Sequence, residues 1–569
     1  MRSRVLPIVL LLLVAGLFLV ANRGAYKSYF TDDEIDNIAL TRNMVNSDFI
    51  LAFLSPRFYP SNFRPACHLC FRIMGSSVGL NYPPYVALLH ILHLFNVAIL
   101  WLILRRLSLP FWASVAGTLF FVFHMAVFDV YWKPMYVCDL LCGTFCLLAL
   151  LFWMEDRWLL SLVSFWLAYR SKEMAVMLPI ALAAYEMLIG NRRWLRLAPF
   201  FAISLWFGIH GLMATTSHEG YWFHCNLPDI WKSVMFYSSR LAVLPYNGLI
   251  FLPFLFLLPL LCPPLVRDRT VWFGAIAFFV LLAPMLLLTD RLFAAYLYVP
   301  LIGLSIAIAA AAARQPVAAI AIAFALWIPW NYANLRWLRR EALSQADDRR
   351  AYVAGIADVA RIHPEITTFL YRAGPLTDWG ARSAAEWFHP GSTIKLAYEG
   401  NPDPAAVLQS PAFAVLEWNT IKHRLEPVVR MPATRDVSYI EISQHMPVWQ
   451  LGEGWVTNEG AFRWTHPHAT AHLYRPSGAS GFEMIVNVSP EYIGKVHTSH
   501  VALSLNGQSI GSADFDHSGW QTVHWKLENA PAGPAELIVN TSPAYPGREP
   551  LGIAICAFGF LPKPEALKE

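Results

Sequence analysis

The stretch YVALLHILHLFNVAILWLILRRL, residues 85–107, carries no charged side chain before Arg105. A helix needs about 20 apolar residues to cross the hydrocarbon core of a bilayer, and this stretch supplies them. Reading the first 335 residues against that length gives about eleven candidate spans, which begin near residues 5, 86, 110, 136, 158, 173, 196, 248, 271, 292 and 315. The sequence therefore predicts a polytopic α-helical membrane protein.

The composition excludes a purely aqueous globule. The 569 residues are 56% apolar and 14% charged, whereas an average soluble domain has about 25% charged residues. The formal charge is only +4, and the basic residues are scattered at the ends of the spans. A nucleic-acid-binding protein gathers such residues into a patch. We therefore expect a lipid bilayer as a partner and no nucleic acid.

The arginines of the short connections predict the orientation of the spans. Arg2 and Arg4 precede the first span and place the amino terminus in the cytoplasm. If the spans alternate, every short basic connection falls on that side, namely those with Arg105 and Arg106, Arg157, Arg192, Arg193 and Arg196, Arg267 and Arg269, and Arg314. An odd number of spans then places the chain after residue 335 outside the cytoplasm. We expect an integral protein of a bacterial inner membrane with its carboxy-terminal domains in the periplasm. The first segment fits either a span or a cleaved signal peptide.

The sequence pattern changes after the last span. Residues 1–335 form the predicted membrane domain, which includes a first extracytoplasmic loop at 23–85. Residues 336–450 mix helical and short apolar runs and indicate a small extracytoplasmic α/β region. Residues 451–569 alternate in strand fashion and contain the hairpin signal Asn506-Gly507, so we predict a jelly-roll-like β-sandwich. Its tryptophans could stack on sugars, but core packing is the commoner role; they are Trp455, Trp464, Trp520 and Trp525.

The cysteines do not form a recognisable framework. Cys138, Cys142 and Cys146 recur every four residues, as on one face of a helix. Cys67 and Cys70 have the CxxC spacing, but no second pair follows at the distance of a zinc site. We interpret most of the eight cysteines as small buried apolar side chains.

Three adjacent acids, Asp32, Asp33 and Glu34, follow the first span. They could be a solvated start of the loop, or one of them could act as a general base. Together they could also bind a divalent cation. Three acids beside a membrane are costly unless they face water or a cation, which favours a functional role.

Further ionisable residues follow along the predicted membrane domain. Arg64 precedes Pro65 and could hold a phosphate with two hydrogen bonds, or simply cap the loop. His124 and Asp129 close the third span, and Lys172-Glu173 and Asp290-Arg291 could be internal ion pairs. The predicted topology places all of these residues at the same membrane face, which favours a shared cavity over separate ion pairs.

This arrangement resembles the C-type glycosyltransferases (GT-C), polytopic enzymes that use polyprenyl-phosphate-linked sugars. The acidic cluster and residues 35–45 are similar to the first-loop signature of protein O-mannosyltransferases and of the aminoarabinose transferase of lipid A. Further motifs resemble stretches of the transmembrane tetratricopeptide-repeat O-mannosyltransferases: Phe63-Arg64-Pro65, Phe123-His124 with Asp129, Ser171-Lys172-Glu173, and Asp290-Arg291 followed by Tyr296-Leu297-Tyr298-Val299-Pro300. The resemblance covers about residues 1–335, and the chain departs from the latter family in lacking carboxy-terminal helical repeats.

The resemblance implies an inverting transfer of a sugar from a polyprenyl-phosphate donor to an acceptor hydroxyl of a glycan, lipid or protein at the outer face. It implies that Asp33, or else Asp32, is the base that activates the acceptor. It also implies a set of residues that bind the phosphate or the sugar of the donor, namely Arg64, Lys172, Glu173, Arg291, Tyr298, Asp129 and His124. No cofactor is implied with certainty, and a divalent cation at Asp32, Asp33 and Glu34 stays open.

Two other classes of protein fit parts of the sequence. A polytopic transporter or lipid flippase commonly shows inverted repeats and helices broken at mid-membrane, whereas the ionisable groups of this chain gather at one predicted face. A membrane-anchored carbohydrate-binding or assembly protein would use the predicted sandwich alone. The glycosyltransferase hypothesis accounts for more of the charged residues.

Overall fold

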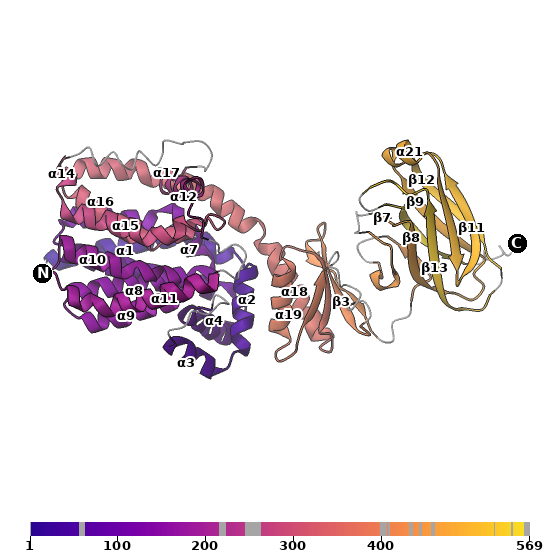
Figure 1. The fold of residues 1–569 in the computed structure, drawn as a ribbon, viewed down its shortest axis with the longest axis horizontal. Helices are drawn as coiled ribbons and strands as arrows, with labels where there is room; N and C mark the ends of the chain where they lie inside the picture. The colour runs from indigo at the N-terminus through magenta and orange to yellow at the C-terminus, as the bar shows by residue number, and fades with distance from the viewer. Residues whose placement is uncertain are drawn as a thin grey trace. The chain divides into compact units, whose positions relative to one another are not determined.

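The computed structural model describes residues 2–55, 63–215, 223–244, 263–398, 407, 410–431, 436–442, 446–456, 461–528, 530–547 and 550–562. The chain divides into two compact units, Met1–Arg349 and Arg350–Glu569 (Figure 1). Residue 335, where the sequence pattern changes, falls inside the last long helix of the first unit.

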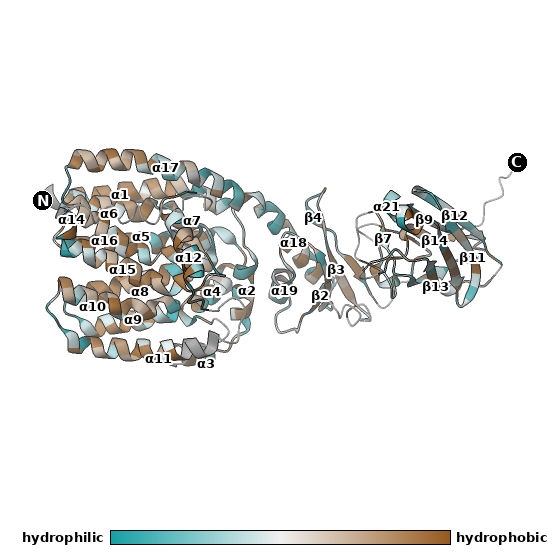
Figure 2. Ribbon diagram, turned by 45° about the horizontal axis from the view of Figure 1, so that its top comes forward, coloured by the Kyte–Doolittle hydropathy of each residue, from teal (hydrophilic) through white to brown (hydrophobic). Residues whose placement is uncertain are grey.

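The first unit is a bundle of helices. Its longer members are α1 (Arg2–Asn22), α5 (Tyr82–Arg106), α6 (Phe111–Phe123), α8 (Val137–Met154), α9 (Trp158–Ser171), α10 (Leu178–Leu188), α11 (Ala198–Thr215), α12 (Leu227–Leu241), α15 (Arg269–Leu286), α16 (Pro300–Ala312) and α17 (Val317–Ser344). Shorter helices are α2 (Asp32–Asn43), α3 (Asn46–Leu54), α4 (Pro65–Val78), α7 (Phe128–Trp132) and α14 (Pro263–Val266). In Figures 1 and 2, α2, α3 and α4 lie at the end of the bundle opposite to the N-terminus.

Within the described residues, six helical segments are long and apolar enough to cross a bilayer: Leu6–Lys27, Tyr82–Arg106, Phe111–Trp132, Pro134–Met154, Arg269–Leu286 and Val317–Ile362. Two further apolar helices are shorter, Trp194–Ile209 and Pro300–Ala312. The segments expected from residues 158 and 173 contain α9 and α10, of 14 and 11 residues, and the one expected from residue 248 lies outside the described residues. The polytopic helical fold is confirmed, whereas the count of about eleven spans stays a prediction.

The outside of the bundle is apolar, as contact with lipid requires. Along α5, Ile91, Phe95 and Leu102 are exposed, whereas Leu89 and Leu100 are buried against other helices. Because lipid tails replace water in a bilayer, a helix can be apolar on both faces there. Figure 2 shows the bundle helices mainly in brown, while the C-terminal part of α17 turns teal.

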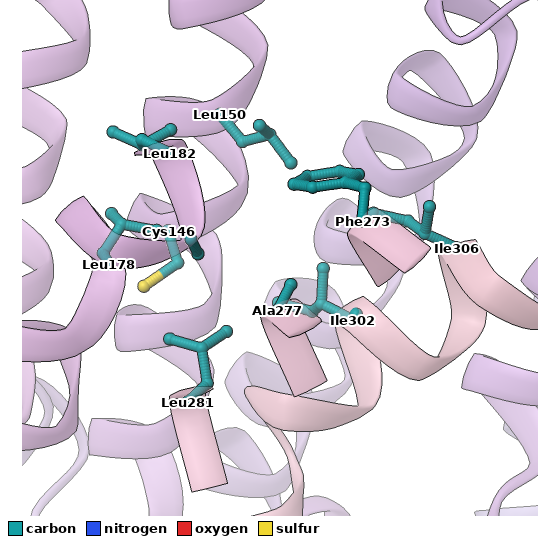
Figure 3. A pocket seen from close by; sticks show the side chains of 11 residues that line it. Cys146, Leu150, Leu178, Leu182, Phe273, Ala277, Leu281, Ile302 and Ile306 are labelled. Carbon is teal, nitrogen blue, oxygen red and sulfur yellow. The ribbon is translucent and has the colours of Figure 1, made fainter. Parts of the chain in front are cut away.

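The interior of the bundle is closely packed, with a small void between α8, α10, α15 and α16 (Figure 3). Its volume is about 20 Å³, which is about the room that one water molecule takes. Only apolar side chains and Cys146 line it, among them Leu150, Leu182, Phe273 and Ile306. A void of this size and lining is too small for a substrate and offers it no polar side chain.

The second unit contains a small α/β part. Three parallel strands, β1 (Thr368–Ala373), β2 (Lys395–Tyr398) and β3 (Phe413–Asn419), pair in the order β2–β1–β3. The short strands β4 (Arg424–Leu425) and β5 (Val428–Arg430) pair antiparallel with β3. Helix α18 (Ala346–Ile362) precedes β1, and α19 (Asp378–Phe388) connects β1 to β2. A helix between two parallel strands is the usual βαβ crossover.

Two antiparallel sheets form the rest of the second unit. One has the order β11–β10–β13–β8, and the other has the order β12–β9–β14–β6 with β7 paired to β14. Their strands are β6 (Tyr439–Glu441), β7 (Arg463–Trp464), β8 (His468–Arg475), β9 (Gly481–Val488), β10 (Ser499–Leu505), β11 (Gln508–Phe515), β12 (Gly519–Lys526), β13 (Gly533–Ser542) and β14 (Ala554–Leu561). Asn506 and Gly507 both have positive φ, at 48° and 78°, and connect β10 to β11. This geometry is that of a type I′ turn and confirms the predicted hairpin.

One hydrophobic core lies between the two sheets. Side chains from both sheets contribute to it, such as Met484 of β9 and Leu503 of β10, as the alternating pattern predicted. Among the tryptophans, Trp525 is buried in this core, and Trp455 and Trp464 pack against it. Trp520 is 61% exposed. The core interpretation is therefore confirmed for three of the four and wrong for Trp520.

Candidate functional site

The acidic cluster forms the first turn of α2, and its third member has a structural task. Thr31 and Glu34 make a capping box, in which the Thr31 hydroxyl donates to Glu34 Oε2 at 2.6 Å and the Thr31 N–H donates to the same oxygen. The backbone N–H of Met135 lies 3.5 Å from the other oxygen, Oε1. Glu34 is fully buried, and burial raises the pKa of its carboxyl group. Glu34 therefore anchors α2 to the chain before α8.

Asp33 lies half-buried beside Asp32, and three cationic side chains lie within electrostatic range of it. Burial raises the pKa of the Asp33 carboxyl group, and the negative charge of Asp32 adds to this effect. Arg291, Arg64 and Lys133 lie within electrostatic range and oppose it, but the net pKa remains above that of an ordinary aspartate. A carboxylate that takes up a proton more readily than usual is a better general base near neutral pH.

Arg64 is held by Glu173, 109 residues further along the chain. Arg64 is the N-cap of α4, and its Nε donates to both carboxylate oxygens of Glu173, at 2.9 and 3.1 Å. The side chains are 23% and 34% exposed. Burial alone would raise the pKa of Glu173, but the adjacent guanidinium outweighs it and lowers that pKa. The pair therefore stays ionised and faces solvent in part.

Lys172 pairs with Asp139 in the interior. Its Nζ lies 2.5 Å from Asp139 Oδ1, with the side chains only 7% and 1% exposed. The same ammonium lies 4.5 Å from the ring centroid of Tyr296, within the range of a cation–π interaction. Lys172 and Glu173 thus have separate partners, and the interpretation of Lys172-Glu173 as an internal pair is wrong. Phosphate binding by Lys172 stays a prediction.

Asp129 and Asp290 each pair with a residue that was not among the expected site residues. Asp129 pairs with Lys133 at 2.9 Å, across one turn at the end of α7. Asp290 pairs with His224 at 3.0 Å, and the expected pair of Asp290 with Arg291 stays a prediction. His224 also reaches Asp229 of α12 at 3.2 Å and thereby holds the turn that carries Arg291.

His124 and Tyr298, two of the expected site residues, are buried in the interior of the bundle. His124 is fully buried, accepts a hydrogen bond from the N–H of Ala126 at 3.2 Å and packs against Trp327. Tyr298 is also fully buried, and its hydroxyl lies 2.9 Å from His93 Nδ1 and from Asn96 Nδ2. These contacts give both residues structural roles in the bundle, and their contact with a donor stays a prediction.

A disulfide joins Cys67 of α4 to Cys138 of α8. The spacing of the cysteines did not predict this pairing, because the two residues are 71 positions apart. Because Cys67 is bonded to Cys138, it is not free to act with Cys70 as a CxxC metal ligand. Both cysteines are buried, as expected for most of the eight, but they are bonded to each other and so are not simply small apolar side chains. Disulfides persist in oxidising compartments and are rare in the cytosol.

No group of three His, Cys, Asp or Glu side chains suited to a metal ion occurs among the described residues. Glu34, one of the three acids considered as ligands, has both carboxylate oxygens in the contacts that anchor α2. A divalent cation at this cluster therefore has at most Asp32 and Asp33 as side-chain ligands from it.

The sequence interpretation missed Lys133 and His68. Lys133 stands four residues after Asp129, a spacing that pairs opposite charges on a helix and could have indicated it. His68 follows Arg64 at the same spacing, and its Nδ1 lies 3.1 Å from the backbone nitrogen and 2.9 Å from the carbonyl oxygen of Arg64.

No family model and no curated protein match this chain. Among solved structures, it is similar to ArnT from Cupriavidus metallidurans bound to undecaprenyl phosphate. The two sequences are 14% identical, the match covers 70% of this chain and 86% of that chain, and the TM-score is 0.39. A likeness at this level carries no argument about the site, which rests on its own geometry.

Proposed function

We propose that the protein is an inverting glycosyltransferase, which moves a sugar from a polyprenyl-phosphate donor to an acceptor hydroxyl at the non-cytoplasmic face of the membrane. The observation that carries this proposal is the half-buried Asp33 carboxylate with Arg64, Arg291 and Lys133 in electrostatic range, at one end of an apolar bundle. Sugar transfer from a lipid phosphate needs a base for the acceptor and cations for the leaving group.

Asp33 acts as the base in this mechanism. It takes the proton of the acceptor hydroxyl while the acceptor oxygen attacks the anomeric carbon of the donor sugar. The new bond joins that oxygen to the anomeric carbon, and the bond between this carbon and the phosphate oxygen breaks. Because attack is opposite to the leaving phosphate, the anomeric configuration inverts. The raised pKa of Asp33 favours proton uptake at this step.

The cations hold the departing phosphate. Arg64 is oriented by Glu173, and the turn that carries Arg291 is oriented by the His224–Asp290 contact. Guanidinium groups bind phosphate oxygens in a planar fork, whereas an ammonium acts as a point charge. We therefore assign the phosphate to Arg64 and Arg291, with Lys133 adding positive charge beside Asp33.

The disulfide supports a non-cytoplasmic site. Cys67 lies three residues after Arg64, and Cys138 directly precedes Asp139. Because disulfides persist in oxidising compartments, this bond supports a non-cytoplasmic location for the end of the bundle where α4 meets α8. The short arginine-rich connections are predicted to be cytoplasmic, and the alternating spans then predict the non-cytoplasmic side for the acidic cluster as well.

A transfer assay tests the proposal. The purified protein in liposomes receives a panel of polyprenyl-phosphate-linked labelled sugars together with envelope glycans, lipids and proteins as acceptors. We expect label in one acceptor class and release of polyprenyl phosphate. Asp33→Asn should lower the rate about 100- to 10,000-fold. Asp48→Asn, at an exposed position of α3, should leave the rate unchanged.

Two results would overturn the assignment. Wild-type turnover by Asp33→Asn would exclude Asp33 as the base. Substrate counterflow in the same liposomes, with no covalent transfer from any donor, would favour a transporter or flippase.

A further inference from the structure

The disulfide lies at the edge of the proposed site and is shielded from solvent. Cys67 belongs to the first turn of α4, which begins directly after its N-cap, Arg64. Its partner Cys138 is in the first turn of α8 and directly precedes Asp139. Cys67 is 1% exposed and Cys138 is 5% exposed. One covalent bond therefore ties the turn that presents Arg64 to the turn that presents Asp139.

Two ion pairs close this connection into a ring. Asp139 pairs with Lys172, the next residue is Glu173, and Glu173 pairs with Arg64. Starting from Arg64, the ring runs along α4 to the disulfide, through α8 to Asp139, across to Lys172-Glu173 at the end of α9, and back to Arg64 (Figure 1 labels α4, α8 and α9). The first turn of α4, the first turn of α8 and residues 172–173 are thus linked to one another next to the Arg64 guanidinium.

The links of the ring differ in strength. The Arg64–Glu173 pair is 23% and 34% exposed, and partly exposed ion pairs contribute little because water and salt screen them. Within α4, His68 adds a contact to the backbone of Arg64: burial lowers its pKa to about 4, and Nδ1 of the neutral ring lies 2.9 Å from the Arg64 carbonyl oxygen. The Asp139–Lys172 pair is buried, with side chains 1% and 7% exposed, but only the disulfide is covalent.

We propose that the Cys67–Cys138 disulfide is a positioning element of the site, which holds the first turn of α4 against α8 so that Arg64 faces the donor phosphate. This role rests on the proposed function. The disulfide takes no part in the transfer step and acts only through Arg64.

The test compares two double variants of the full-length protein in nanodiscs. Cys67→Ala/Cys138→Ala removes the disulfide. Cys70→Ala/Cys146→Ala removes two free cysteines from the same two helices and serves as the matched control. Hydrogen–deuterium exchange of residues 64–68 reports the order of the first turn of α4. Binding of undecaprenyl phosphate reports the phosphate site, and both double variants are also made in an Arg64→Lys background.

We expect faster exchange of residues 64–68 and at least tenfold weaker binding of undecaprenyl phosphate in Cys67→Ala/Cys138→Ala only. In the Arg64→Lys background, loss of the disulfide should not weaken binding further, because a positioning element that acts through Arg64 has nothing left to position. A disulfide that merely stabilises the fold would weaken binding equally in both backgrounds.

Each other outcome overturns one of the two proposals. Unchanged exchange of residues 64–68 excludes the positioning role, whatever the affinity, and so does faster exchange with unchanged affinity. An additive loss in the Arg64→Lys background also excludes it. Failure of the wild-type protein to bind undecaprenyl phosphate overturns the proposed function, while the exchange data alone still decide whether the disulfide orders α4.

Discussion

Replacing Lys172 with methionine tests how the buried pair with Asp139 contributes to the structure. The side chains are 7% and 1% exposed, and Lys172 Nζ lies 2.5 Å from Asp139 Oδ1. The expected loss of stability is therefore that measured for buried ion pairs in other proteins. Removing one partner of such a pair destabilises a protein by about 3–5 kcal/mol, because the other charge stays buried without compensation. The lost cation–π contact with Tyr296 adds about 0.5–2 kcal/mol.

We therefore expect Lys172→Met to lower the folding equilibrium constant by about two and a half to five powers of ten. Lys172→Met/Asp139→Leu leaves no buried charge and should be much more stable than Lys172→Met alone. Glu173→Gln is the matched control, since it breaks a pair that is 34% exposed on the Glu173 side; a loss of about 1 kcal/mol or less is typical of such pairs.

The assay is thermal unfolding of the purified variants in one detergent, followed by transfer or phosphate-binding measurements on those that fold. A Lys172→Met variant as stable as the wild type would refute the reasoning, as would a Lys172→Met/Asp139→Leu variant whose loss equals the sum of the losses of Lys172→Met and of Asp139→Leu measured alone. If the double variant folds but binds no polyprenyl phosphate, Lys172 contacts the donor as well.

Three further variants or conditions follow from the site. The transfer rate should fall as the pH drops through the raised pKa of Asp33, since the protonated carboxyl cannot act as a base; a rate–pH profile whose acid limb lies at the ordinary aspartate value contradicts this. Arg64→Lys should raise KM for the donor, because an ammonium lacks the planar fork, and an unchanged KM excludes Arg64 from phosphate binding. Glu34→Ala leaves the N–H groups of Thr31 and Met135 without their acceptor and should destabilise the protein by about 1–3 kcal/mol; unfolding at the wild-type temperature would show that the capping box is dispensable.

The folded pKa of Asp33 also predicts the sign of its effect on stability. A carboxyl group whose pKa is higher in the folded than in the unfolded chain binds its proton more tightly when folded. Its ionised form therefore destabilises the fold above that pKa, and the effect disappears as the pH falls. Asp33→Asn should accordingly unfold no earlier than the wild type at neutral pH, which separates lost activity from lost folding.

Much of the architecture was predictable because its signals are local. The run at 85–107 is long and apolar enough to require a membrane, and the structure has α5 over that stretch. The Asn506-Gly507 turn needs positive φ at both positions, which these two residue types tolerate, and the hairpin is there. The lengths of α9 and α10 were less predictable, because apolar runs interrupted by turns do not reveal where each helix ends.

The sequence by itself determined that a helical bundle lies in lipid, that β-structure follows it, and that the short arginine-rich connections are predicted on one side and the acidic cluster on the other. These properties depend on side-chain hydropathy and on residues close together in the chain. Only the tertiary structure decided that Arg64 pairs with Glu173, that Lys172 pairs with Asp139, and that Cys67 bonds to Cys138. Such pairings depend on which helices pack side by side. The spacing of residues along the chain does not contain that information, because partners 109, 33 and 71 positions apart meet only after the bundle has formed.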